Sequence, residues 1–191
     1  MTLPPSEHRA PLEALGLKGP ALGRLAAYLD TLAAWSPRVN LTGARTAAER
    51  VTWLVADVVA AAHLPAPGRL IDVGSGNGTP GLVLALLRDD LDVTLLEPRA
   101  RRWAFLREAA RATGRPGIDV LRLRHDSYSG PAAETVTLRA LALPLAEFQR
   151  LLRPGGRLIV FGGRPLAGPG FTASVEGQGL PGGVTVFRRT S

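Results

Sequence analysis

The sequence predicts an α/β fold: a mostly parallel sheet covered by helices on both faces, preceded by an N-terminal helical segment. Two observations favour it. From residue 69 onward, short apolar runs alternate with amphipathic segments in strand–helix order. At the start of that alternation, Asp72-Val-Gly-Ser-Gly-Asn-Gly78 joins a buried strand to a helix. With 191 residues, the chain is long enough to bury a full core.

Residues 1–64 are expected to form a helical cap. A short helix is possible from Pro11 to Leu15, and apolar residues from Leu22 to Ala33 recur at helical spacing. A second long helix is expected at about 47–62, with its valines on one side. The remainder, residues 65–191, is expected to form the α/β domain.

Seven strands are expected in that domain, the last two as a closing antiparallel hairpin after a Gly/Pro-rich loop at 162–170. They lie at 69–73, 92–96, 118–123, 135–139, 157–161, 171–176 and 184–188, with helices at 80–88, 99–113 and 144–152. Ligands of such sheets bind outside the carboxyl ends of the strands. Asp72, Glu97, the 124–126 segment and Arg139 are therefore expected to share one site.

The glycines of the strand–helix junction predict a nucleotide site. Gly74, Gly76 and Gly78 allow a tight turn and close approach of a ligand to the backbone. Thr79 is a plausible N-cap and Pro80 a plausible first helical residue, so the exposed N–H groups of the helix start favour a polar or anionic ligand. A dinucleotide fingerprint would need glycine at position 79, so a dinucleotide site is excluded.

The spacing of the turn instead resembles motif I of the S-adenosylmethionine-dependent methyltransferases. The next strand ends in Glu97, and an acid about 20 residues after the glycine turn is placed to bind ribose hydroxyls. The resemblance implies S-adenosyl-L-methionine as the cofactor.

Composition limits the other classes. The net charge is +7, almost entirely from arginine, which favours an anionic partner such as RNA, although a biased genome could produce the same composition. The chain has no cysteine, and its three histidines lack an obvious ligand set, so we expect no metal site. No apolar run approaches the about 18 residues of a membrane helix and no signal peptide is visible, so we expect a cytoplasmic protein without membrane contact.

Several motifs in one order are similar to the glucose-inhibited division protein B family, the small-subunit ribosomal RNA guanine-N7 methyltransferases. The similarity spans about Trp35 to Gly163. It rests on Asn40-Leu-Thr42, Asp72 to Gly81, Phe105-Leu-Arg-Glu108, Thr137-Leu-Arg-Ala140 and Leu152-Arg-Pro-Gly-Gly156. The resemblance implies a seven-stranded class I methyltransferase (Rossmann-like) sheet, methylation of guanine N7 in 16S ribosomal RNA, and ribosomal RNA or the small ribosomal subunit as partner. We expect a monomer.

The resemblance also implies roles for individual residues. Gly74 and Thr79 would contact the methionine and sulfonium region, together with Ser75, Gly76 and Gly78 of the same turn. Glu97 would hold the ribose. His125 and Asp126 would border the adenine, His125 through its backbone alone.

Arg139 is the residue expected to act in catalysis, close to both the cofactor and the incoming guanine. The alternative is that Arg139, at the end of its strand, forms an ion pair with a structural acid.

Two departures from the family pattern keep other functions open. Leu54 stands where the family has a histidine, and Gly162 stands where it has a lysine. The alternatives are a cofactor-binding paralogue with little RNA methylation activity, acting in regulation or interaction, and a methyltransferase of a small molecule.

RNA bases often stack on aromatic side chains or arginine planes. The candidate aromatics are Trp35, Trp53 and Trp103, and helical spacing favours a place in the core for each of them. The predicted helix at 99–113 could carry a basic stripe, or merely a solvated face, formed by Arg99, Arg101, Arg102, Arg107 and Arg111.

Overall fold

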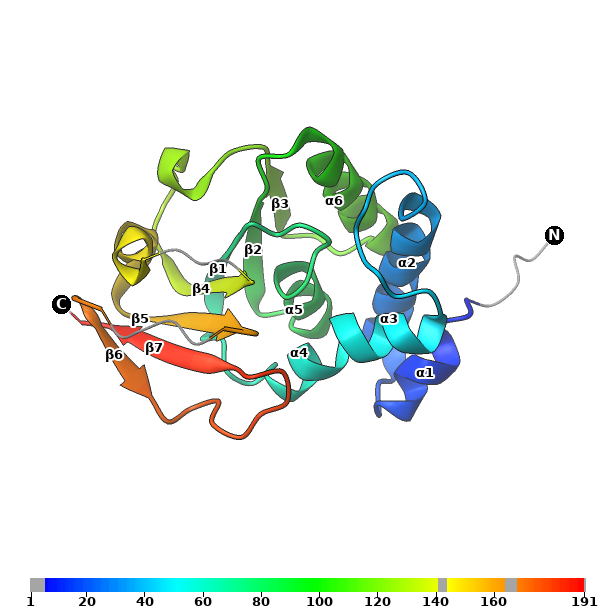
Figure 1. Cartoon of the computed structure of the whole chain (residues 1–191), viewed down its shortest axis with the longest axis horizontal. Helices are drawn as coiled ribbons and strands as arrows, with labels where there is room; N and C mark the ends of the chain where they lie inside the picture. Colours follow the sequence, from blue (N-terminus) through cyan, green and yellow to red (C-terminus); the bar gives the residue numbers. More distant parts are fainter. Residues whose placement is uncertain (1–5, 141–143, 164–167, 191) are drawn as a thin grey trace.

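The computed structural model describes residues 6–140, 144–163 and 168–190. They contain one seven-stranded sheet of order β3-β2-β1-β4-β5-β7-β6 (Figure 1). The parallel strands are β1 (Gly68–Val73), β2 (Leu91–Leu96), β3 (Ile118–Leu121), β4 (Ala133–Arg139) and β5 (Leu152–Phe161). β7 (Thr185–Arg189) runs antiparallel to β5 and to β6 (Phe171–Ser174). The predicted sheet with its closing hairpin is confirmed.

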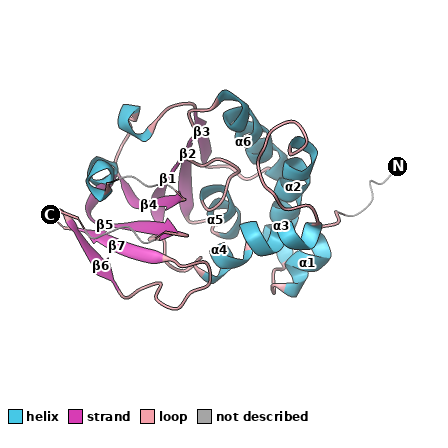
Figure 2. Cartoon of the chain, viewed as in Figure 1, coloured by secondary structure: helices cyan, strands magenta, loops and turns pink. Residues whose placement is uncertain are grey.

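The two faces of the sheet are covered differently (Figure 2). One face carries all the α-helices of the described residues, which share one apolar cluster with alternate strand residues. They are α1 (Arg9–Ala14), α2 (Gly19–Trp35), α3 (Ala47–Leu54), α4 (Ala56–Ala60), α5 (Gly81–Leu87) and α6 (Ala100–Thr113). The other face is covered by two 3-10 helices, η1 (His125–Ser127) and η2 (Leu145–Leu151). Helices therefore cover both faces as expected, but on the second face they are short 3-10 helices and not α-helices.

Two predicted helices need correction. The segment expected to be helical at 47–62 is two helices, because the backbone of Val55 leaves helical geometry (φ −121°, ψ −41°). The segment expected to be an α-helix at 144–152 is the 3-10 helix η2. Its buried residues Leu145, Phe148 and Leu151 recur every three positions, which matches the three residues per turn of a 3-10 helix. The loop expected at 162–170 lies partly outside the described residues, at 164–167.

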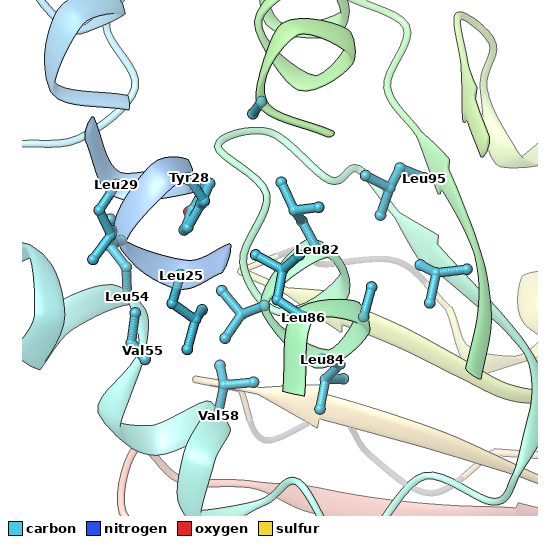
Figure 3. Packing of buried hydrophobic residues seen from close by; sticks show 14 of the residues in the cluster. Leu25, Tyr28, Leu29, Leu54, Val55, Val58, Leu82, Leu84, Leu86 and Leu95 are labelled. Atoms are coloured by element: carbon cyan, nitrogen blue, oxygen red, sulfur yellow. The ribbon is translucent and has the colours of Figure 1, made fainter. Parts of the chain in front are cut away.

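The cap and the α/β part share one core. Leu25, Tyr28 and Leu29 of α2 pack in the same cluster as Leu54 of α3 and Leu82 of α5 (Figure 3). Apolar burial therefore runs continuously across the boundary expected at residue 64 and holds the cap against the sheet.

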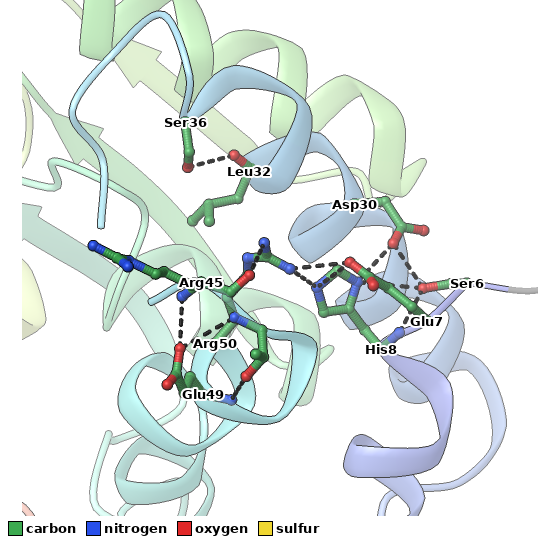
Figure 4. Close-up of polar contacts among 10 residues, drawn as sticks. Ser6, Glu7, His8, Asp30, Leu32, Ser36, Arg45, Glu49 and Arg50 are labelled. Atoms are coloured by element: carbon green, nitrogen blue, oxygen red, sulfur yellow. Dashed lines mark hydrogen bonds and ion pairs between the residues drawn. The ribbon is translucent and has the colours of Figure 1, made fainter. Parts of the chain in front are cut away.

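A polar cluster fixes the outer end of the cap (Figure 4). His8 is fully buried, and its Nδ1 lies 2.7 Å from Asp30 Oδ1, while its Nε2 lies 3.2 Å from a guanidinium nitrogen of Arg50. The Thr46 hydroxyl and the Glu49 carboxylate form a reciprocal capping box at the start of α3. These contacts join α1, α2 and α3.

Among the residues that the structure describes, no helix is both long and apolar enough to span a membrane.

Candidate active site

The glycine turn lies between β1 and α5, at the carboxyl edge of the sheet. The N–H groups of Gly74 and Ser75 donate to the carbonyl of Leu96 at 2.9 and 3.1 Å, which ties the turn to the end of β2. Gly74, Gly76 and Gly78 have φ values of +70°, +54° and +96°, a region that favours glycine. The turn that the sequence predicts is therefore present. Gly74 is partly exposed, whereas Ser75, Gly76, Gly78 and Thr79 are buried.

Glu97 lies directly against this turn. It is 3% exposed, and its Oε2 accepts a hydrogen bond from the N–H of Gly76 at 3.0 Å. Its Oε1 accepts from the N–H of Arg99 at 2.8 Å. A carboxylate has about four lone-pair sites, so Glu97 can still accept hydrogen bonds from hydroxyl groups. The two backbone hydrogen bonds therefore fix the Glu97 carboxylate against the turn.

An apolar cavity of about 180 Å³ lies beside the turn, between the ends of β1, β2 and β3. Its lining is Val73, Gly74, Leu96, Pro98, Leu123, Arg124 and His125. Such a lining suits a flat aromatic heterocycle. Sequence reasoning missed its apolar residues because aliphatic side chains carry no chemical pattern. Only their position in the sequence could have indicated them, because each lies at or just after the end of a strand, close to a predicted site residue.

His125 and Asp126 occupy this edge in different ways. The His125 ring turns toward η2, where Nε2 lies 2.7 Å from Glu147 Oε2 and the ring lies beside Phe148. The ring is therefore engaged with η2, and the expectation that only the backbone of His125 serves the site stays a prediction. The Asp126 carboxylate is exposed and accepts from Arg124 Nε at 3.0 Å, a contact that lowers the pKa of Asp126. Asp126 does not line the apolar cavity.

Arg139 lies at the end of β4 and pairs with an acid from the cap. Its Nη2 donates to Asp57 Oδ2 at 2.8 Å, and its guanidinium lies 5.1 Å from the centre of the Phe161 ring. The structural ion pair considered as an alternative is thus present. Asp57 Oδ1 and Arg139 Nε are buried and lack a hydrogen-bond partner in the described part of the chain. The ion pair thus leaves two buried polar atoms unsatisfied among the described residues, while 23% of the Arg139 side chain remains accessible.

Asp72 lies beneath the turn, with only 1% of its surface exposed. Its Oδ1 accepts from the hydroxyl of Thr137 at 2.6 Å. Burial raises the pKa of Asp72 to about 6, although the Thr137 hydrogen bond and the charge of Arg139 act in the opposite direction. Asp72 therefore supports the turn from the core and does not open to solvent.

Three hydrogen bonds join the cap to the glycine turn. Tyr28 donates its hydroxyl to the carbonyl of Asn77 at 2.8 Å, and Asn77 Nδ2 donates to the carbonyl of Leu41 at 3.0 Å. The hydroxyl of Thr79 donates to the carbonyl of Leu54 at 2.7 Å. Sequence reasoning missed Tyr28 and Asn77, since their contacts span 49 and 36 residues.

The expected helix start is wrong by about one residue. The N-cap of α5 is Pro80 and its first residue is Gly81, and no side chain caps it. Thr79 does not serve as the N-cap because its hydroxyl is directed to Leu54 on α3. Leu54 is 6% exposed and packs in the core, so the position where the family has a histidine is apolar here.

The arginines of α6 are not a uniform stripe. Arg102 Nη2 donates to the carbonyl of Asn40 at 3.4 Å, so it belongs to the junction with the cap. Arg107 lies over the Trp103 ring, and Arg111 pairs with Glu108 at 2.6 Å. Of the two alternatives for this helix, these contacts favour a solvated face over a dedicated binding surface for Arg107 and Arg111.

Residues 22–167 match the family described as rRNA small subunit methyltransferase G. The chain belongs to this family of S-adenosylmethionine-dependent methyltransferases. It is 43% identical to the ribosomal RNA small subunit methyltransferase G of Rhodospirillum centenum, over 81% of this chain and 73% of that protein. It is 36% identical to the protein of the same name from Chromohalobacter salexigens, over 94% of this chain and 86% of that protein.

Solved structures support the fold of this family member. A crystal structure of MtNAS in complex with S-adenosylmethionine superposes with a TM-score of 0.61, at 15% identity, over 88% of this chain and 72% of that one. An rRNA methylase from Streptococcus thermophilus superposes with a TM-score of 0.51, at 14% identity, over 70% of this chain and 94% of that one. At these identities the likeness concerns the fold, which is the class I methyltransferase fold that the sequence predicts.

Glu97→Ala is expected to weaken binding of S-adenosylmethionine by about 1–3 kcal/mol, roughly 5- to 150-fold, because hydrogen bonds to a buried charged group are lost. Glu97→Gln, which keeps one acceptor oxygen, should lose less. Titration calorimetry measures both affinities. Unchanged affinity together with lower thermal stability would show that Glu97 only holds the turn and the start of α6.

Asp72→Asn is expected to change how stability depends on pH. The ordinary pKa of the carboxyl is 3.8 and the folded value is about 6, so between these values the folded protein binds more protons than the unfolded chain. The contribution of Asp72 to the free energy of unfolding therefore falls by about 3 kcal/mol as the pH rises through this window.

The measurement is the difference in unfolding free energy between wild type and Asp72→Asn, by denaturant titration from pH 4 to 7. Carboxylates common to both proteins cancel in that difference. A difference independent of pH would contradict the raised pKa.

Proposed function

We propose that this chain transfers the methyl group of S-adenosylmethionine to N7 of a guanine in the RNA of the small ribosomal subunit. The observation that carries the proposal is the glycine turn with the Glu97 carboxylate hydrogen-bonded to it, in a member of this family. Bound S-adenosylmethionine supplies an electrophilic methyl group on a sulfonium.

The residues around the turn fit this cofactor. The apolar cavity beside Gly74 suits the adenine, and the free lone pairs of Glu97 suit the ribose hydroxyls. The turn from Gly74 to Thr79, including Ser75, Gly76 and Gly78, is assigned to the methionine part, with the partly exposed Gly74 as its accessible end. His125 borders the adenine through its backbone, whereas the side chain of Asp126 is left out of the cavity.

Guanine N7 carries a lone pair and no proton, so its methylation requires no general base. The protein acts chiefly by holding N7 in line with the methyl group. Such positioning can lower the activation free energy by up to about 7–11 kcal/mol. Arg139 is assigned to this task. About 23% of its side chain is accessible, so the guanidinium can face an acceptor on the purine, while Asp57 keeps it at the sheet edge.

The net charge of +7 supports an RNA substrate, because phosphate contacts supply most of the sequence-independent affinity for nucleic acids. One observation favours the second candidate, a cofactor-binding protein with little methylation activity. The buried Leu54 and the left-handed Gly162 (φ +68°) replace the histidine and lysine of the family pattern.

The test uses small ribosomal subunits that lack this methyl group, and naked small-subunit RNA in parallel, with radiolabelled S-adenosylmethionine. We expect label as N7-methylguanine, identified by mass spectrometry of the digested nucleosides, and none with a variant that cannot bind cofactor. A protein that binds S-adenosylmethionine but labels neither substrate would support the second candidate. Label in any other nucleoside would refute guanine N7 as the target.

A further inference from the structure

Trp53 is the one exposed aromatic side chain in the described part of the chain, with 52% of its surface accessible. The other tryptophans are engaged: Trp35 packs edge-to-face on Phe105, and Trp103 donates its indole N–H to the carbonyl of Val120 at 3.2 Å. The expectation of a place in the core is therefore wrong for Trp53. On α3 it lies on the side opposite the apolar side of Val51 and Leu54.

Trp53 adjoins the site described above. It precedes Leu54, whose carbonyl accepts the hydroxyl of Thr79 in the glycine turn. Asp57, the partner of Arg139, follows four residues later on α4, beyond the break at Val55. On its other side, a Cβ placed on Gly43 would lie 3.9 Å from the indole. The ring thus lies beside Gly43 in the 40–46 segment, on the helix whose last residue accepts the Thr79 hydroxyl.

The charges near the ring suit a polyanion. Arg45 is exposed, two residues from Gly43, and Arg102 reaches the carbonyl of Asn40 in the same segment. The nearby acid is Glu49, one turn before Trp53 on α3. Its solvent-accessible carboxylate accepts from the N–H groups of Arg45 and Thr46 through Oε2, and these bonds lower the pKa of Glu49.

We propose that Trp53 is a stacking platform for an unpaired base of the RNA substrate, at the entrance to the methyl-transfer site. The proposal rests on the proposed function for the identity of the RNA. An exposed indole offers a face on which any base can stack, and the arginines beside it fit the phosphates. Trp53 would be a positioning residue that sets affinity for RNA without touching the cofactor.

The kinetic test compares Trp53→Ala, Trp53→Phe and the matched control Trp103→Phe. With small subunits as substrate, Trp53→Ala is expected to raise KM about 5- to 150-fold, the range for loss of one stacked base. Trp53→Phe should keep most of the affinity, and Trp103→Phe should match wild type. The Kd for S-adenosylmethionine should stay at the wild-type value in all three variants.

A second readout does not depend on methylation. Stacking on an indole quenches its fluorescence, so titration of the wild type with naked small-subunit RNA should quench a component that Trp53→Phe lacks and Trp103→Phe retains. If the wild type labels no RNA, the proposed function fails, yet this titration still decides for or against the platform.

Two results would overturn the proposal. One is an unchanged KM for Trp53→Ala together with quenching that persists in Trp53→Phe. The other is a raised KM on intact subunits with unchanged binding of naked RNA, which would assign Trp53 to a protein of the particle.

Discussion

Replacing Gly76 with valine is expected to abolish binding of S-adenosylmethionine, and with it all methylation, while the protein stays folded. A Cβ at this position would lie 3.5 Å from the carbonyl oxygen of Gly74 and 3.7 Å from Arg102, so the free protein has room for it. The φ of +54° is, however, a strained conformation for a β-branched residue. Relief of that strain would move the N–H of residue 76, which donates to the Glu97 carboxylate, and the methyl groups of the valine would cover the turn.

The matched control is Gly114→Val. Gly114 ends α6 with a φ of +65°, and a Cβ there meets no atom within 4 Å. The control therefore imposes similar backbone strain, about 1–3 kcal/mol, far along the chain from the glycine turn. Calorimetry and thermal unfolding of the two variants separate loss of the site from loss of stability. Wild-type affinity in a folded Gly76→Val protein would refute the cofactor site.

Arg139→Ala is expected to remove methylation and to lower the free energy of unfolding by about 3 kcal/mol. The loss of stability follows because Asp57, with only 11% of its side chain exposed, keeps a charge without a partner. The estimate takes the lower end of the range for buried pairs, since 23% of the Arg139 side chain is accessible.

The double variant Arg139→Ala with Asp57→Asn distinguishes a structural role from a catalytic one. Neutralising Asp57 should recover most of the lost stability, measured by urea unfolding. Methylation by the double variant should stay absent if Arg139 orients the purine. If methylation recovers together with stability, Arg139 has only a structural role, as the ion-pair partner of Asp57 in the cap.

The parts of the site that the sequence predicts are local ones. Asp72, the three glycines of the turn and Glu97 lie within two strands and one turn, so their arrangement follows from strand–turn–helix geometry. The alternation predicts a mostly parallel sheet, but it does not contain the order of the strands, in which β4 follows β1 on the side away from β2.

The parts that could not be predicted depend on distant contacts. Nothing near Thr79 indicates that its hydroxyl binds the carbonyl of Leu54, 25 residues earlier, and not the end of its own helix. The break at Val55 is hidden because the apolar periodicity of α3 continues into α4. The exposure of Trp53, by contrast, could have been found from its place opposite Val51 and Leu54 on the helix.

The hydrogen bond from Thr79 to Leu54 has a thermodynamic consequence for how the two substrates bind. It connects the cofactor turn to the residue next to Trp53, so the two sites share one structural element. If the same position of α3 favours both ligands, RNA stacking on Trp53 tightens binding of S-adenosylmethionine, and the cofactor tightens RNA binding by the same factor, since coupling between two ligands is reciprocal. The two substrates would then bind with positive cooperativity, and the demethylated cofactor and the RNA would leave more readily once either had gone.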